Sequence, residues 1–321
     1  MQRINLITTC SNSKGKTNST LRLHCIKHKY DNLHELALSW SKRITECMQN
    51  NEPIDAINLY KGSHWANALK AKNNKYVDLW VVSAGLGLLN ANDNTINYQA
   101  TFTPDSDDSI PAYGMTNKES SRLWWSYLCN IKNNYSRCKS IASLMESKND
   151  EFFIIAGSNI YINAILDDLI KGANFLSNPQ KQLVIITSSA ELLNENNIIT
   201  DCFLSSSKLM LPWLQCNATS LNISLANKFI ELLKEHEFDY CSTKQLINEM
   251  HNAIPVTAKA DKIKCTDEHL RIYILNELKC NSNISATKCL VKLRNSGRCA
   301  EERRFRKVFL DIKNSYKQTV A

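Results

Sequence analysis

The clearest pattern in the chain is a set of short apolar runs, each of which ends in small polar residues. Residues 79–82 form a run that is too short and too β-branched for a helix, and Gly85 and Gly87 stop it. Residues 4–7, 152–156 and 183–186 are runs of the same kind, and Thr, Ser, Cys or Gly follow each of them. The runs predict four buried strands whose carboxyl ends share one polar crevice.

Between these runs, apolar residues recur at helical spacing. The expected helices cover residues 33–48, 119–131, 159–170 and 221–236. A further helix is expected to begin at Lys61, Gly62 and Ser63. We expect the pair Trp124 and Trp125 to be half buried. Buried strands that alternate with helices predict an α/β fold with an open, mostly parallel, Rossmann-like sheet.

Residues 90–113 show neither pattern. They are rich in Asn and Asp, contain two prolines, and carry Asp105, Asp107 and Asp108. A long irregular segment of this kind is either functional or mobile. A lid over the crevice and a solvated surface loop both fit the sequence.

The carboxyl-terminal part has a different character, and we place a domain boundary between residues 240 and 241. Helical spacing recurs at 267–278, 285–293 and 300–315, with a turn at 295–297. Residues 259–321 carry 15 Lys and Arg against 7 Asp and Glu, so their net charge of +8 equals that of the chain. This predicts a basic helix-turn-helix or winged-helix-like nucleic-acid binder, and the alternative is a solvated helix face. The candidate contacts are Arg294, Arg298, Arg303, Arg304, Arg306 and Lys307.

The composition is that of an ordinary soluble globular protein, with 43% hydrophobic and 22% charged residues among 321. No apolar run approaches the roughly 18 residues of a membrane span, and no signal-peptide pattern is present, so we predict a cytoplasmic protein without membrane partners. The twelve cysteines form no CxxC pair and read as reduced, mostly buried thiols. Cys25 with His24 and His28 is the nearest approach to a metal cluster, and we expect neither metal nor cofactor.

Cys10 is the candidate nucleophile, because it follows a strand and a nearby cation would favour its thiolate. Ser11, Ser13 and Lys14 lie beside it in the sequence. Lys14 and Ser11 are candidate catalytic partners, and Ser13 is a candidate for substrate binding. A small buried filler is the competing interpretation of Cys10. The convergence of the strand ends on one edge favours the nucleophile.

Other side chains are candidates for binding a ligand. Tyr60, Trp65 and Tyr98 offer flat surfaces for a nucleobase, although buried aromatic residues more often belong to a core. Ser83, Ala84 and Gly85, and the pair Gly157 and Ser158, follow strands and can meet a phosphate. His64 and Asp78 could complete a Cys, His and acid arrangement, but their approach to Cys10 does not follow from the sequence.

Five segments in this order resemble an uncharacterised-domain family. They are CSNSK after the first run, LYKGSHW, WVVSAGLGLL, INYQATF and AGSNIYINAI. Members of that family are encoded with transglycosylase paralogs that place 7-deazaguanines in DNA. The pattern is also distantly similar to the peroxide-stress protein family and to a domain of archaeosine synthase. The resemblance covers residues 4–165, about half of the chain.

The resemblance implies a DNA-modification enzyme that hydrates the 7-cyano group of a 7-deazaguanine base to the 7-amido group. Cys10 would form a thioimide with the nitrile carbon, while Lys14, Ser11 or Ser83 would assist the developing nitrogen anion. The implied partners are DNA, a nucleotide or modified base as ligand, and proteins of a modification or defence cluster. The alternative is a non-catalytic nucleotide-sensing or DNA-binding module of a phage-defence system, and a third possibility is an interaction subunit with a vestigial crevice.

Overall fold

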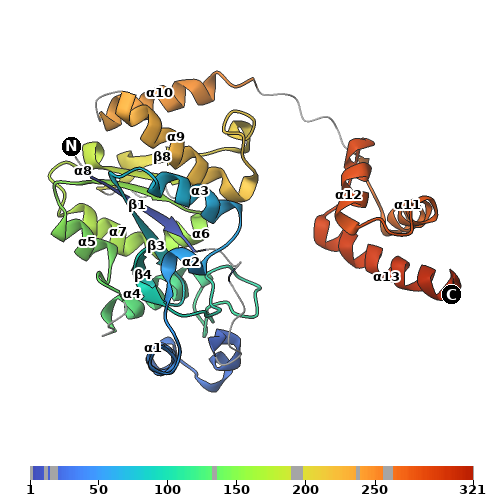
Figure 1. The fold of residues 1–321 in the computed structure, drawn as a ribbon, viewed down its shortest axis with the longest axis horizontal. Coiled ribbons are helices and arrows are strands. Elements are labelled where there is room, and N and C mark those ends of the chain that lie inside the picture. Colours follow the sequence, from blue (N-terminus) through green and yellow to red (C-terminus); the bar gives the residue numbers. More distant parts are fainter. Residues whose placement is uncertain are drawn as a thin grey trace. The chain divides into compact units, whose positions relative to one another are not determined.

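A computed structural model describes residues 3–10, 14, 21–131, 136–188, 198–235, 239–255 and 263–320, with side chains as far as residue 316. It divides the chain into two compact units, Met1–Ile254 and Pro255–Ala321 (Figure 1). Within the described residues, no helix has both the length and the apolar character to cross a membrane.

The boundary lies later than the one predicted between residues 240 and 241. Helix α10 (Tyr240–Asn252) packs against α9 (Leu221–Glu235) in the first unit. Its first residue, Tyr240, is buried, and its ring centroid lies 5.1 Å from that of Phe229 and 4.8 Å from that of Phe152. Apolar packing through this ring assigns α10 to the first unit.

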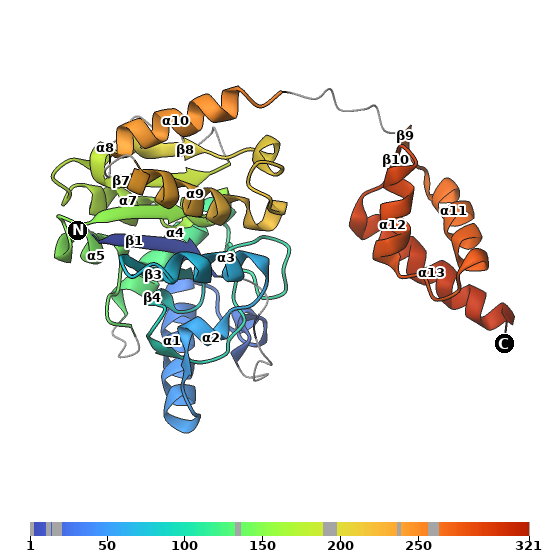
Figure 2. The same ribbon diagram turned by 45° about the horizontal axis from the view of Figure 1, so that its top comes forward.

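A six-stranded sheet forms the centre of the first unit, with the strand order β4-β3-β1-β6-β7-β8 (Figure 2). All neighbouring pairs are parallel except β3 and β4. Numbered along the chain, the parallel strands have the order 2-1-3-4-5, one of the two common orders of doubly wound sheets. The mixed α/β fold with a mostly parallel, Rossmann-like sheet is confirmed. The strands are β1 (Ile4–Thr9), β3 (Val77–Ser83), β4 (Gly87–Asn90), β6 (Phe152–Ala156), β7 (Leu183–Thr187) and β8 (Phe203–Ser205).

Strand β1 is central, and all six of its residues are buried. It pairs with β3 on one side and β6 on the other, and the ladder continues through Thr8 and Thr9, opposite Val81 and Val82. The apolar run therefore predicted the strand but ended two residues too early, because β-branched threonines also fit a buried parallel ladder.

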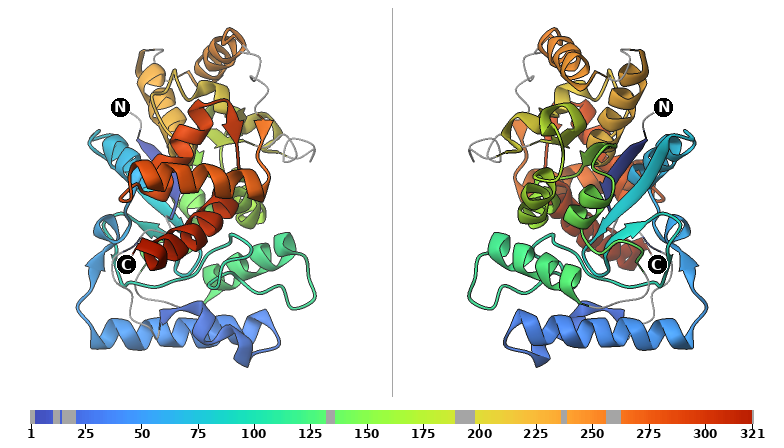
Figure 3. Two further views of the ribbon diagram at one scale, coloured as in Figure 1. Left: turned by 90° about the vertical axis from the view of Figure 1, so that its right-hand side faces the viewer. Right: turned by 90° about the vertical axis from the view of Figure 1, so that its left-hand side faces the viewer.

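Helices cover both faces of the sheet. Helix α3 (Ser63–Lys72) packs against α9 and β3, and α9 contacts β6 and β7. On the other face, α5 (Ile141–Ser147) packs against α7 (Leu166–Ala173), while α4 (Asn117–Asn130) contacts α6 (Asn159–Ala164) and β4. Helix α1 (Leu33–Asn50) lies beside α4 (Figure 3). Shorter elements are β2 (Ile54–Asp55), α2 (Ala56–Leu59), β5 (Asn94–Thr95) and α8 (Pro179–Gln182).

Strand β3 leads into an antiparallel hairpin with β4. Two local expectations need correction. The expected helix at 159–170 is interrupted at Ile165, where α6 ends and α7 begins. Trp124 and Trp125 are fully buried and not half buried. Their indole N–H groups donate hydrogen bonds to the Ala84 carbonyl and to Asp168, so no polar group of either side chain needs contact with water.

The acidic segment at 90–113 is packed against the unit. Asp108 is buried, and its carboxylate accepts hydrogen bonds from Arg22 Nη2 at 2.7 Å and from the His24 amide at 3.1 Å. Phe102 and Ile110 belong to the core. The solvated-loop interpretation is therefore wrong for Asp108, although Asp105 and Asp107 are exposed.

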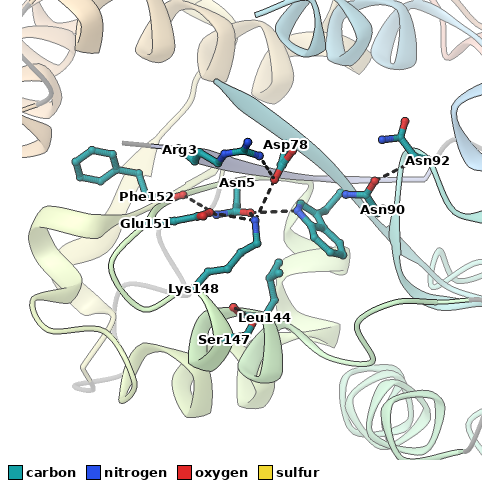
Figure 4. A network of polar contacts seen from close by, with 11 residues as sticks. Arg3, Asn5, Asp78, Asn90, Asn92, Leu144, Ser147, Lys148, Glu151 and Phe152 are labelled. Carbon is teal, nitrogen blue, oxygen red and sulfur yellow. Dashed lines mark hydrogen bonds and ion pairs between the residues drawn. The ribbon is translucent and has the colours of Figure 1, made fainter. Parts of the chain in front are cut away.

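A polar network lies at the amino-terminal ends of the strands (Figure 4). Lys148 Nζ is 3.0 Å from Asp78 Oδ2, 3.1 Å from Glu151 Oε2 and 3.2 Å from Asn5 Oδ1. Asn5 is buried in the middle of the sheet and also donates to Glu151 Oε2 at 2.7 Å. The network satisfies the one polar amide in an otherwise apolar stretch of β1.

The second unit contains helices α11 (Asp267–Cys280), α12 (Ala286–Asn295) and α13 (Glu302–Val320). They pack around a separate apolar core that includes Leu270, Leu293 and Phe305. A two-residue parallel pair, β9 (Ile263–Lys264) with β10 (Arg298–Cys299), joins the start of the unit to the turn after α12. The three expected helices are present, and this short pair is an addition to them.

Candidate active site

A cleft of about 580 Å³ opens at the carboxyl ends of the central strands. Residues after β1, β6 and β7 line it, together with the start of α3. The chain order reverses between β1 and β6, since β3 lies on one side of β1 and the later strands lie on the other. Ligands of open α/β sheets bind at this kind of switch point. The lining residues that could react or bind a ligand include Cys10, Lys61, His64, Ser158, Tyr161 and Lys208.

Cys10 lies directly after β1 and lines the cleft, with only 6% of its surface exposed. Its amide bonds to the Val82 carbonyl at 3.0 Å, which continues the β1–β3 ladder by one residue. Its Sγ lies 3.2 Å from the Tyr161 hydroxyl, which comes from α6. Burial raises the pKa of Tyr161 well above its usual value, so the phenol keeps its proton at neutral pH.

Lys14 lies against the rings of two tyrosines. Its Nζ is 4.5 Å from the Tyr98 ring centroid and 5.7 Å from the Tyr60 ring centroid. Lys14 and Tyr60 also form an isolated antiparallel β-bridge through their backbones. Burial lowers the pKa of Lys14, and attraction to Cys10 and Asp108 opposes this shift. Within the described residues, this buried ammonium has no hydrogen-bond acceptor. The aromatic faces therefore supply the contacts that a carboxylate would otherwise give.

A chain of hydroxyl groups lies behind Lys14. Tyr60 Oη is 3.2 Å from Tyr98 Oη, which is 2.6 Å from Ser83 Oγ. Burial raises the pKa of Tyr98 well above its usual value. Lys14, Tyr60, Tyr98 and Ser83 thus come together, and none of the four lines the cleft itself.

The turn after β3 is packed inward. The amides of Gly85 and Leu86 donate to Ser83 Oγ at 3.3 and 2.9 Å. The carbonyls of Ala84 and Gly85 accept indole N–H groups at 2.8 and 2.7 Å. Ser83, Ala84 and Gly85 are buried, so these groups support the site from behind, and the Gly85 and Leu86 amides are not available to a phosphate.

Gly157 and Ser158 follow β6. A Cβ on Gly157 would lie 2.8 Å from Thr9 Cγ2, so this glycine permits the close approach of the β1 and β6 ends. Its carbonyl accepts from Asn222 Nδ2 at 2.6 Å. Ser158 is exposed and lines the cleft, and its side chain does not cap α6.

His64 lines the same cleft as Cys10, but Asp78 does not. His64 Nε2 lies 2.9 Å from Thr8 Oγ1, and burial lowers the pKa of the ring, which is therefore neutral at pH 7. Asp78 pairs with Asn5 at the opposite end of the strands and forms an ion pair with Lys148. The three residues therefore form no Cys, His and Asp arrangement.

The aromatic residues chosen for base stacking are core residues. Trp65 is buried, and its indole donates to the Ile57 carbonyl at 2.9 Å. Tyr60 and Tyr98 are also buried. Tyr161 is the aromatic residue that faces the cleft, and sequence reasoning missed it because its apolar neighbours on α6 give the pattern of a core helix.

Ser11 and Ser13 lie outside the described residues. Lys61 and Lys208 are cleft residues that the sequence did not single out. They come from segments far apart in the chain, and only the fold brings them to one opening.

In the second unit, two of the six predicted nucleic-acid contacts are tied in ion pairs. Arg304 Nε lies 2.6 Å from Asp267 Oδ1, and Arg306 Nη2 lies 2.9 Å from Glu302 Oε1. Four other side chains are exposed and form no ion pair with a described residue: Arg294, Arg298, Arg303 and Lys307.

In the part of the chain that the structure describes, no group of three or more His, Cys, Asp and Glu residues could hold a metal ion. All twelve cysteines are free, and four of them are buried: Cys10, Cys202, Cys265 and Cys289. Most of the others are partly buried, so the thiols are less enclosed than expected. Compared with protein-family models, with curated proteins and with solved structures, the chain matches none.

Proposed function

We propose that the α/β unit is a cysteine-dependent enzyme that hydrates the 7-cyano group of a 7-deazaguanine base in DNA to the 7-amido group. The observation that carries this proposal is the thiol of Cys10, which lies in the cleft at the switch point, 3.2 Å from the Tyr161 hydroxyl. The resemblance of residues 4–165 to proteins of 7-deazaguanine DNA modification supplies the substrate.

The first step is addition of Cys10 Sγ to the nitrile carbon. A carbon–sulfur bond forms, and the thiol proton is transferred to the nitrile nitrogen, which gives a thioimide. We assign the transfer of this proton to Lys14, whose pKa is lowered by burial. The Tyr161 hydroxyl stabilises the reacting sulfur by a hydrogen bond.

The second step is hydrolysis of the thioimide. Water adds to its carbon, the carbon–sulfur bond breaks, and the sulfur regains a proton as the amide forms. One nitrile and one water give one amide, so the reaction needs neither an oxidant nor a reductant. Tyr161 and the Lys14 ammonium are the groups that stabilise charge on nitrogen and sulfur in this sequence.

The second unit is the part of the chain that we expect to bind DNA. Its exposed Arg294, Arg298, Arg303 and Lys307 supply cations for phosphate contacts. A helix-turn-helix or winged-helix-like binder is the finer assignment we propose, with α12 and α13 as its helix pair. The target base must leave the duplex to reach a cleft in the α/β unit.

The test is incubation with duplex DNA that contains 7-cyano-7-deazaguanine, followed by digestion and mass spectrometry of the nucleosides. We expect a mass gain of one water, about 18 Da, on the modified nucleoside. Cys10→Ser abolishes this product, and Cys241→Ser, at an exposed thiol away from the cleft, is the matched control. Lys14→Met lowers the rate by about a hundredfold.

Full activity of Cys10→Ser overturns the mechanism. A protein that binds the DNA but forms no product overturns the enzymatic proposal and assigns the chain to the non-catalytic class of sensing or DNA-binding modules. Binding is measured separately by fluorescence anisotropy, so that loss of DNA contact is not mistaken for loss of chemistry.

A further inference from the structure

The irregular segment at 101–110 contacts the aromatic residue of the cleft. Phe102 packs edge-to-face on Tyr161, with ring centroids 5.2 Å apart and an angle of 81° between the ring planes. Both side chains are buried. Thr103, the next residue, lines the cleft together with Cys10 and Tyr161. The segment therefore supplies both a part of the cleft wall and a support for the tyrosine.

The same segment also reaches the Tyr161 hydroxyl. Burial raises the pKa of Tyr161, and an interaction with the Thr101 side chain opposes this rise. Thr101 Oγ1 accepts a hydrogen bond from the Thr103 amide at 3.1 Å, so the threonine proton is available for a second partner. Two neighbouring residues, Thr101 and Phe102, thus contact Tyr161 at its hydroxyl and at its ring.

The backbone next to Phe102 is held on both sides. The Thr101 amide donates to the Asp108 carbonyl at 3.0 Å, and the Thr101 carbonyl accepts from the Ile110 amide at 3.1 Å. The Asp108 carboxylate is fixed in turn by Arg22 Nη2 at 2.7 Å. These bonds give the Phe102 ring a fixed position from which it can support a neighbour.

Tyr161 needs such a support because its own helix does not fix the hydroxyl. Helix α6 has six residues, and it sets the place of the Tyr161 backbone. The side chain still has two rotatable bonds, so the position of the hydroxyl depends on what packs against the ring. That hydroxyl lies 3.2 Å from Cys10 Sγ, and a turn of the ring would lengthen this contact.

We infer that Phe102 is a positioning residue, which holds the Tyr161 ring so that the hydroxyl stays within hydrogen-bond distance of Cys10 Sγ. Phe102 does not line the cleft, so it acts through Tyr161 and not on a ligand. The inference rests on the proposed function only in taking Cys10 as the reacting residue. It gives the irregular segment a function in the site.

A double-mutant cycle on the alkylation of Cys10 tests this role. The reagent is iodoacetamide at pH 7, and peptide mass spectrometry of the full chain gives the rate. The thiolate is the form that reacts, and a phenol that donates to the sulfur favours it. We expect Tyr161→Phe to slow alkylation by about fivefold, through the loss of a hydrogen bond to a charged group. Phe102→Leu slows it by about threefold, through the loss of the aromatic pair, and has no further effect in the Tyr161→Phe background.

The matched control is Phe229→Leu. Phe229 makes an edge contact of the same kind with Tyr240, at 5.1 Å and 68°, and neither residue lines the cleft. This control keeps the wild-type rate of alkylation. Phe102→Met is measured beside Phe102→Leu, so that failure of one variant to fold leaves the test in place. A wild-type rate in the Phe102 variants, or an equal effect of Phe102→Leu with and without the Tyr161 hydroxyl, overturns the inference.

The two proposals fail separately. Alkylation needs no turnover, so the cycle decides the role of Phe102 even if no amide product forms. Where product forms, Phe102→Leu lowers kcat and leaves KM for the DNA unchanged, because Phe102 does not line the cleft. A raised KM with unchanged kcat would refute the positioning role and leave the hydration reaction intact.

Discussion

Gly85 is the position where one methyl group tests the link between the core and the site. A Cβ at this residue would lie 2.5 Å from Cδ2 and Cε2 of Tyr98 and 3.3 Å from the Ala100 Cβ. Carbon atoms in contact are normally about 3.5–4.0 Å apart, so the Tyr98 ring must move by about 1 Å. The ring is buried, and its hydroxyl bonds to Ser83 at 2.6 Å.

Gly85→Ala is therefore an overpacking substitution. Gly85 does not adopt a left-handed conformation, so the backbone itself accepts alanine. Overpacking and the loss of one buried hydrogen bond together lower the free energy of unfolding by about 2–4 kcal/mol. Movement of the Tyr98 ring also displaces the surface on which the Lys14 ammonium lies.

Urea unfolding followed by tryptophan fluorescence measures this loss, because all six tryptophans belong to the first unit. In a Tyr98→Ala background the clashing ring atoms are gone, and Gly85→Ala then costs less than about 1 kcal/mol. Gly114→Ala is a control for backbone strain alone, since Gly114 has φ +84° and no heavy atom within 4 Å of its Cβ position. An equal cost of Gly85→Ala with and without the Tyr98 ring would refute the packing argument.

Three further predictions concern charge. Burial lowers the pKa of Lys14 from its ordinary 10.5, so between the folded-state and unfolded-state pKa values the unfolded chain binds more protons than the folded chain. The free energy of unfolding therefore rises with pH over that window. Lys14→Met removes this rise in urea titrations below about pH 10, where tyrosines begin to ionise. The pKa of His64 is lowered from 6.5, so stability falls as pH drops through and below that value, and His64→Gln flattens the profile of urea midpoints between about pH 7 and pH 5. Arg303→Ala/Lys307→Ala lowers the slope of log affinity for DNA against log salt by about 2, and an unchanged slope would show that these two side chains do not contact phosphate.

The sheet was predictable because a buried parallel strand is apolar on both faces. The residues of the runs at 4–7, 152–156 and 183–186 are buried in the core, as their apolar character indicates. The hairpin after β3 was not predictable from the same pattern. Gly85 and Gly87 end a strand in the sequence pattern whether a helix or an antiparallel strand follows. The hairpin is recognised only from the structure, in which Ser83 pairs with Gly87.

The site was predictable in part for a related reason. Residues that follow parallel strands meet at one edge, which explains why Cys10, Ser83 and Ser158 come from the expected places. This pattern does not indicate how deeply each of these residues is buried. Ser83 is buried while Ser158 is exposed, because the turn after β3 is covered by two tryptophans of distant helices. Lys208 reaches the cleft through a segment that has no periodic pattern at all.

The amide of Asn5 gives the central strand a reference point along its length. Ile4, Leu6 and Ile7 are buried and apolar, and their side chains form no directional bonds that mark a position along β1. Asn5 donates to Glu151 at 2.7 Å and accepts from Trp80 at 3.2 Å. A shift by one residue would take the amide away from both partners, and a buried polar group without partners costs about 1–3 kcal/mol. A single polar residue thus selects the register that brings Cys10 to the edge of the sheet.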